Sequence, residues 1–248
     1  MLNEYLAKIE KKLKPGGWYR IVFLGDSITS TEWVHPNWRE IIEYVLKNVL
    51  GEIMGEWQTP SWKIRCYNAG FDGGFTGDMI KYADEEIAPL RPDLVVFMDT
   101  YNDKYFDVSP DKHGKNLGII FDKLVRISED NVFSSSIARF KPEANEVNRK
   151  YMASARTAVE KYEGKIKIIN LFEKFSVLEL KKFFTFVITE EDADASIGVY
   201  QGEIDFSHPN QIGNAYVAKI LLKEIFDIKF DADLYIKETL EGKKYPAY

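Results

Sequence analysis

The sequence has few of the features that mark secreted, membrane or disulfide-stabilised proteins. It contains one cysteine, Cys66, so no intramolecular disulfide can form. Cys66 lies in a strand-like stretch, which favours a buried, unreactive thiol over a nucleophile. No apolar run approaches the roughly 20 residues of a membrane-spanning helix, and the N-terminus has no signal-peptide core. We therefore expect a soluble, cytoplasmic protein without a membrane partner.

The charged residues show no excess that would indicate a nucleic-acid ligand. Lysine and arginine number 33 against 39 aspartate and glutamate residues, which gives a net charge of −6. No block of basic residues stands out, so we predict no nucleic-acid partner. Nothing resembles a metal-binding cluster either, and we expect neither a metal nor an organic cofactor.

Strand-like and helix-like segments alternate along the whole chain. Strands are predicted at 18–24, 62–67, 94–98, 131–137 and 165–170, and helices at 2–14, 38–50, 76–87, 113–128, 142–162, 173–183 and 210–226. No linker interrupts this pattern, so we predict one domain over residues 1–248. The expected fold is α/β and doubly wound, a flavodoxin-like three-layer α/β/α arrangement with a five-stranded parallel sheet. Residues 18–226 would form its core, with an N-terminal helix at 2–14 and a C-terminal tail at 227–248 that packs back on it.

The sequence Gly25-Asp26-Ser27 follows the first predicted strand directly. Ser27 would therefore lie at the carboxyl edge of the sheet, where open α/β folds bind ligands. An equally simple interpretation is that Asp26 and Ser27 only cap a helix that starts near Thr29.

A second feature lies near the C-terminus, where His208 follows Asp205 by three residues. An aspartate at this spacing in a turn can reach the imidazole Nδ1–H and leave Nε2 free to act as a base. The alternative is a cap for the helix that begins at Pro209. The sequence has three histidines. We expect His113 on the surface near a helix start, and His35 in a loop rich in aromatic residues.

Four segments together resemble the SGNH (GDSL-type) hydrolase family. They occur in the family's order, each at a strand end or in a loop, and they bracket residues 21–226. The matching segments are Gly25-Asp26-Ser27-Ile28, Asn68-Ala69-Gly70 with the glycines after it, Asn102-Asp103, and residues 205–210 with Gly213-Asn214-Ala215 beyond.

The resemblance implies a role for each matching residue. Ser27 would be the nucleophile, His208 the general base and acid, and Asp205 the carboxylate that orients the imidazole. The oxyanion hole would consist of the backbone N–H groups of Ser27 and Gly73 and the side-chain amide of Asn102. Further substrate contacts are expected from Asp26, Trp33, Gly74 and Tyr101.

The sequence departs from the family pattern at two places. Thr100 stands where the third block has glycine, and its larger side chain is expected to narrow the pocket or shift Asn102. The second block has two adjacent glycines, Gly73 and Gly74, either of which fits the oxyanion donor. We take Gly73 as the donor.

The implied activity is serine-dependent hydrolysis of carboxylic esters through a seryl acyl-enzyme. The substrate would be a small-molecule ester or an acylated carbohydrate, and a homo-oligomer is compatible with the sequence. Two alternatives remain open. One is a carbohydrate O-deacetylase or acyltransferase of the same family. The other is a non-catalytic small-molecule or carbohydrate binding protein on the same fold.

Overall fold

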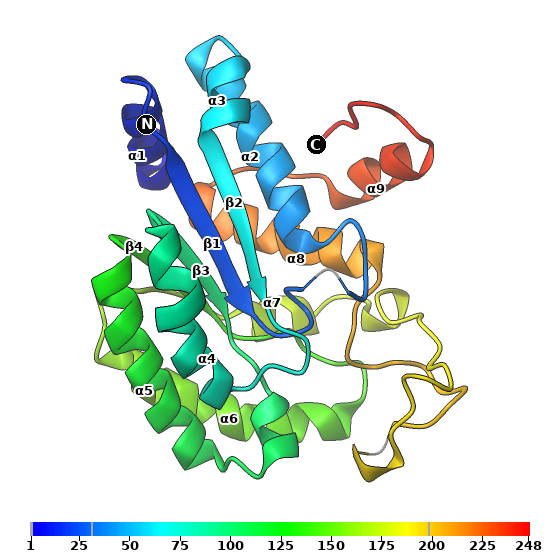
Figure 1. The fold of residues 1–248 in the computed structure, drawn as a ribbon. Helices are drawn as coiled ribbons and strands as arrows, with labels where there is room; N and C mark the ends of the chain where they lie inside the picture. The colour runs from blue at the N-terminus through cyan, green and yellow to red at the C-terminus, as the bar shows by residue number, and fades with distance from the viewer. Residues whose placement is uncertain (1, 31, 198) are drawn as a thin grey trace.

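A sheet of five parallel strands forms the centre of the computed structural model, which describes residues 2–30, 32–197 and 199–248 (Figure 1). The strand order is β2-β1-β3-β4-β5. The chain thus starts inside the sheet and winds outward in both directions, which is the flavodoxin-like, doubly wound order. This confirms the predicted fold class. The strands are β1 (Tyr19–Gly25), β2 (Ile64–Gly70), β3 (Leu94–Met98), β4 (Asp130–Ser134) and β5 (Lys167–Ile169).

Helices cover both faces of the sheet, because successive residues of each strand point to opposite faces. Ile21 and Phe23 of β1 pack in one apolar cluster with α1, α2 and α8, whereas Val22 and Leu24 pack in another with α4, α5 and α6. Figure 1 shows these two helix layers on either side of the strands. The helices are α1 (Glu4–Leu13), α2 (Trp38–Met54), α3 (Gln58–Lys63), α4 (Thr76–Tyr82), α5 (Pro110–Ile127), α6 (Pro142–Glu160), α7 (Leu171–Ser176), α8 (Gln211–Phe226) and α9 (Ala232–Leu240).

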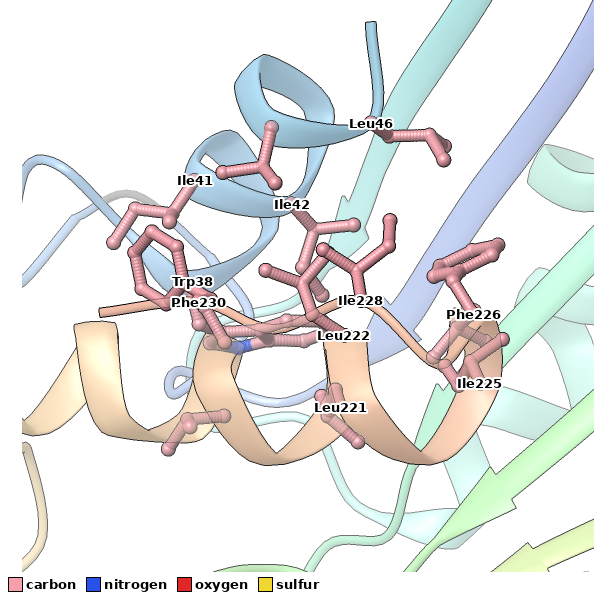
Figure 2. Close-up of a cluster of buried hydrophobic side chains, with 14 of the residues drawn as sticks. Trp38, Ile41, Ile42, Leu46, Leu221, Leu222, Ile225, Phe226, Ile228 and Phe230 are labelled. Carbon is pink, nitrogen blue, oxygen red and sulfur yellow. The ribbon is translucent and has the colours of Figure 1, made fainter. Parts of the chain in front are cut away.

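The packing of α2 against α8 builds much of the first cluster. Branched side chains of α2 meet those of α8, and the segment after α8 adds further apolar side chains (Figure 2). The labelled residues, all buried, are Trp38, Ile41, Ile42, Leu46, Leu221, Leu222, Ile225, Phe226, Ile228 and Phe230. This contact matters for the site because α2 follows the Ser27 turn and α8 follows His208.

The C-terminal tail returns to the body of the protein. Tyr44 of α2 lies 5.8 Å from Tyr235 of α9, measured between ring centroids, and its hydroxyl donates to the carbonyl of Pro246 at 3.0 Å. Within the described residues, no helix has the length and apolar character needed to span a membrane. In β2, burial raises the pKa of the Cys66 thiol, which agrees with an unreactive cysteine.

Several predicted elements have different bounds in the structure. Residues 62–63 belong to α3, so β2 begins only at Ile64. The helix predicted over 76–87 consists of α4 and a wider helical turn, η1 (Ala83–Ile87). The segment predicted as helix 173–183 contains the short α7 and a separate turn, η4 (Leu180–Lys182).

The helix expected near Thr29 is absent from the described residues there, and this prediction was wrong. Asp26 O instead accepts from the N–H groups of Thr29 and Ser30, at 2.9 and 3.1 Å, and closes a single turn. The next helix is α2, which begins after a capping box formed by Asn37 and Glu40.

Candidate active site

The candidate site lies where three neighbouring strands reach their carboxyl ends. Gly25 of β1 is in register with Gly70 of β2, and Leu24 pairs with Phe97 of β3. Ser27, the loop of residues 71–75 and Asn102 follow these three strands. Asn102 begins η3 (Asn102–Phe106). The parallel sheet therefore gathers the three sequence segments at one edge.

The backbones of these segments approach one another closely. A Cβ atom placed on Gly25 would lie 2.2 Å from Thr29 Oγ1, and one on Gly70 would lie 2.3 Å from Ser30 N. No side chain fits at such distances, so only glycine lets the Ser27 turn fold down over the strand ends.

Ser27, His208 and Asp205 form a continuous chain of hydrogen bonds. Ser27 Oγ lies 2.9 Å from His208 Nε2, although the two residues are 181 positions apart. His208 Nδ1 lies 2.5 Å from Asp205 Oδ2. With a neutral imidazole, Nδ1–H donates to the carboxylate, and Nε2 accepts from the serine hydroxyl. The structure thus brings together the three residues that the sequence singles out as nucleophile, base and orienting acid.

Asp205 is held in place by more than the imidazole. Its Oδ1 accepts from the N–H groups of Ser207 and His208, at 2.6 and 3.2 Å. Burial disfavours the carboxylate, but His208 and these two N–H groups outweigh burial and lower the pKa of Asp205. The Asp205 side chain therefore carries its charge where it faces His208.

The first turns of α2 and α8 tie the serine and histidine segments together. The side chains of Asn37 and Trp38 both donate to Ile28 O, each at 3.0 Å, and so fix the turn that follows Ser27. Asn214 of α8 accepts from Trp38 N at 3.0 Å and donates to Pro209 O at 2.8 Å. These bonds connect the residue after Ser27 to the residue after His208 through two rigid helices.

Two backbone N–H groups of these segments, those of Ser27 and Gly73, donate to no backbone carbonyl within the described parts of the chain. Gly73 is exposed and has a φ of 67°, a conformation that favours glycine. Gly74, in contrast, is buried and donates its N–H to Phe71 O at 2.9 Å. Of the two glycines that the sequence left open, Gly74 already uses its N–H within the loop, and Gly73 stays our prediction for the donor.

Asn102 is joined to the same loop. Its Nδ2 donates to Gly74 O at 3.1 Å, which uses one of the two amide hydrogens. The Thr100 hydroxyl donates to the same carbonyl at 2.9 Å and accepts from Asn102 N at 3.1 Å. The Thr100 hydroxyl therefore links the Asn102 backbone to the loop, a contact that glycine cannot make.

Three of the four expected substrate contacts are buried in this structure. Asp26 is 1% exposed, and its carboxylate accepts from Ile28 N at 3.0 Å, so it stabilises the turn. Tyr101 is 2% exposed and packs in a cluster with Tyr151 and Phe172. Gly74 is buried as well. These positions expose almost no surface in this structure, and their contact with a substrate stays a prediction.

Trp33, the fourth residue, is only partly buried and lies on the imidazole of His208. The two rings are stacked, with 3.8 Å between their centroids and 3° between their planes. The indole Nε1 donates to Asp72 Oδ1 at 2.7 Å. Trp33 thus connects the histidine to the loop that contains Gly73.

Sequence reasoning missed two cationic residues beside the site. Arg139, only 7% exposed, donates to the carbonyl of Ser207, the neighbour of His208. Lys104 lies two residues after Asn102 and donates to Asn148 Oδ1 at 3.4 Å. Burial, assisted by Arg139, lowers the pKa of Lys104 to about 8. Lys104 adjoins the third family block, but no pattern in the sequence indicates Arg139.

His113 is fully buried, so its predicted surface position was wrong. It shares a helix face with Leu117, Phe121 and Leu124 of α5, all of which are buried. That spacing was visible in the sequence and would have placed His113 inside the protein.

The protein resembles solved structures, although no protein-family model and no curated protein matches its sequence. The lipase/acylhydrolase from Enterococcus faecalis aligns with a TM-score of 0.59 and 19% identity, over 84% of this chain and 95% of that one. A variant of Axe2, an acetyl xylan esterase from Geobacillus stearothermophilus, aligns with a TM-score of 0.62 and 18% identity, over 87% and 99% of the two chains. The acetyl xylan esterase AlAXEase aligns with a TM-score of 0.61 and 18% identity, over 84% and 100%.

Other solved structures of Axe2 are described as catalytic mutants. In them a serine, an aspartate or a histidine is replaced by alanine, and the aspartate stands three positions before the histidine. They share 18 to 20% identity with this chain, at TM-scores of 0.57 to 0.59. At sequence identities this low, the similarity between these structures and this chain establishes a shared fold only. The chain therefore has the three-layer α/β fold of these acylhydrolase and esterase structures, which is the fold that its SGNH-like sequence segments predict.

Proposed function

We propose that the protein is a serine esterase of the SGNH type, with Ser27 as nucleophile, His208 as general base and acid, and Asp205 as the orienting carboxylate. The hydrogen-bond chain from Ser27 Oγ through His208 to Asp205 carries this proposal. A serine hydroxyl is a weak nucleophile until a neutral imidazole accepts its proton, and this chain supplies that base.

The first half of the reaction acylates the serine. Ser27 Oγ attacks the ester carbon while its proton moves to His208 Nε2, and a tetrahedral intermediate with a negative oxygen forms. The C–O bond to the alcohol then breaks, and His208 returns the proton to the leaving alkoxide. Asp205 accepts from Nδ1–H throughout, which keeps Nε2 toward Ser27 and stabilises the transient imidazolium.

The second half releases the acid. A water molecule loses its proton to His208 Nε2 and attacks the acyl carbon, and the bond to Ser27 Oγ breaks as the proton returns to the serine. In both halves, the Ser27 and Gly73 N–H groups and the free hydrogen of the Asn102 amide would stabilise the negative oxygen. Each such donor is typically worth about 3 to 4 kcal/mol of the barrier.

Acetylated carbohydrates are the substrate class that we favour. Two of the similar structures are acetyl xylan esterases, and the residues replaced in the catalytic mutants of one of them are of the same types as Ser27, Asp205 and His208, with the same spacing between aspartate and histidine. An acyltransferase would use the same residues with a sugar or alcohol in place of water. A non-catalytic binding protein would need neither the serine–histidine bond nor the free N–H groups, so these observations favour an enzyme.

A fluorophosphonate probe tests the nucleophile, because an activated serine attacks its phosphorus, displaces fluoride and becomes phosphonylated. We expect one label per chain, absent from Ser27→Ala and retained in Ser61→Ala, a control in α3. Labelling that survives Ser27→Ala would contradict the assignment. The substrate class is tested by comparing acetate release from acetylated xylo-oligosaccharides with hydrolysis of p-nitrophenyl esters of increasing acyl length.

A further inference from the structure

His113 of α5 lies between the two ends of the short segment that contains Asn102. Its Nε2 lies 3.4 Å from Asp99 Oδ2, and its Nδ1 lies 3.4 Å from Asp103 Oδ2. All three side chains are 0% exposed. Asp99 directly follows β3, and Asp103 is the second residue of η3. One imidazole therefore contacts both ends of residues 99–103.

Two carboxylates buried this close together repel each other, and a buried charge without a partner is costly. An imidazolium between them neutralises one of the two charges. The remaining charge is compensated by hydrogen-bond donors. Asp103 accepts from Thr76 N and Thr76 Oγ1, at 3.0 and 2.5 Å, and Asp99 accepts from Thr100 N at 2.9 Å.

The surroundings of His113 favour its charged form. Burial alone disfavours the imidazolium, but Asp99 and Asp103 outweigh burial and raise the pKa of His113 to about 9. The phenol ring of Tyr151 of α6 also packs against the imidazole, edge-on at 5.3 Å between centroids. Burial raises the pKa of this phenol, so Tyr151 stays neutral and does not alter the charge balance.

Residues 99–103 in turn hold the loop after β2. Thr100 Oγ1 and Asn102 Nδ2 donate to Gly74 O, and Asp103 accepts from Thr76 two residues later. Loss of the charge on His113 would leave two repelling carboxylates at the ends of this segment. The loop beside Gly73 and the Asn102 amide would then lose a common support.

We propose that His113 is a positioning residue, which as an imidazolium between Asp99 and Asp103 holds residues 99–103 so that the Asn102 amide faces the reacting oxygen. This inference rests on the esterase function proposed above. It requires opposite charge states of two histidines, because His208 must be neutral to act as a base and His113 must be charged to support the oxyanion donors.

The test compares His113→Gln with His35→Gln in the full chain. Glutamine is neutral and similar in size to histidine, and the His35 side chain is 79% exposed, which makes it a matched control. The kcat and KM for p-nitrophenyl acetate are measured from pH 6 to 10. We expect His113→Gln to lower kcat at pH 7 by about 10- to 100-fold, less than loss of a whole oxyanion donor, with KM within about twofold. In the wild type and in His35→Gln, kcat falls as the pH rises through about 9, and this loss is absent from His113→Gln.

A His113→Gln protein with the wild-type kcat and pH profile but a lower Tm would overturn the proposal, since that result describes a purely structural histidine. If His113→Gln does not fold, the double variant Asp99→Asn/His113→Gln removes the unbalanced charge together with the imidazole. This variant should fold and show the low kcat without the alkaline loss. A wild-type kcat in the double variant would again reject the positioning role.

A second measurement keeps the two proposals separable. If the wild-type protein hydrolyses no ester, the esterase proposal fails, and the side-chain amide signals of Asn102 are then followed by NMR from pH 7 to 10. They should shift near pH 9 in the wild type and not in His113→Gln. The absence of that shift would reject the positioning role whatever the protein's activity.

Discussion

The indole of Trp33 lies parallel to the imidazole of His208, with 3.8 Å between the ring centroids. A cation above an aromatic face is stabilised by the ring's electrons. In the proposed reaction His208 becomes an imidazolium, so this contact would stabilise the transition state. Trp33 would then act on His208 rather than through the substrate contact expected from the sequence.

Replacing Trp33 separates these two functions. A cation–π contact is typically worth about 0.5 to 2 kcal/mol, so Trp33→Ala should lower kcat by about 2- to 30-fold and leave KM nearly unchanged. Trp33→Phe keeps the aromatic face but loses the bond to Asp72, and it should have a smaller effect. An increase in KM without a change in kcat would indicate a substrate contact instead. Steady-state kinetics on one ester distinguish these results.

Asn102 and Thr100 should affect catalysis to different degrees. Asn102→Ala removes a donor that acts mainly in the transition state, and we expect kcat to fall by about 10²- to 10³-fold with little change in KM. Thr100→Val preserves the side-chain size but removes the hydroxyl bonds to Gly74 O and Asn102 N, so a smaller loss of kcat is expected. The Tm of each variant is measured alongside. A lower Tm with an unchanged kcat for Asn102→Ala would exclude Asn102 from the oxyanion hole.

Asp205→Asn tests the orientation of the imidazole. An amide at this position can donate toward Nδ1, which favours the tautomer that carries its proton on Nε2 and cannot accept from Ser27. We expect kcat to fall by about 10⁴-fold while the fold is retained. Asp194→Asn is a suitable control, because Asp194 also accepts hydrogen bonds from a backbone N–H and a side chain but is exposed. Activity of Asp205→Asn close to that of the control would refute the orienting role.

The charge on His113 should also make stability depend on pH. Folding raises the pKa of His113 from 6.5 to about 9. The folded state therefore binds a proton more tightly than the unfolded state does. The resulting stability is complete below about pH 6.5 and is lost as the pH rises through about 9. Urea unfolding of the wild type at pH 7 and pH 10 should show this decrease, and His113→Gln should show a smaller one. Equal decreases in both proteins would argue against a charged His113.

The contact between α2 and α8 should contribute strongly to stability. Leu222 is fully buried in this contact (Figure 2). Leu222→Ala should therefore lower the free energy of unfolding by about 2 to 5 kcal/mol, the usual cost of truncating a buried leucine. Leu240 of α9 is 74% exposed, so Leu240→Ala should change the free energy of unfolding by no more than about 0.5 kcal/mol. Chemical denaturation of both variants measures the difference, and similar values would mean that the α2–α8 packing is not critical.

Local patterns in the sequence determined the fold class and the chemical identity of the candidate site. The alternation of buried strands with amphipathic helices indicated a doubly wound sheet, because strands covered on both faces consist of almost continuous apolar residues. Ser27, Asp205 and His208 could be selected because the short motifs that contain them, taken together and in order, resemble those of the SGNH family.

Only the tertiary structure decided how the surrounding residues are used. Each of these features depends on contacts between segments that lie far apart in the chain. They are the burial of Asp26 and Tyr101, the stacking of Trp33 on His208, and the position of His113 between two carboxylates. A motif encodes neighbours along the sequence, whereas burial and hydrogen bonding depend on which strand ends and helix faces meet in space. The Thr100 hydroxyl illustrates the difference, since its role follows from the carbonyl of Gly74, 26 residues away in the sequence.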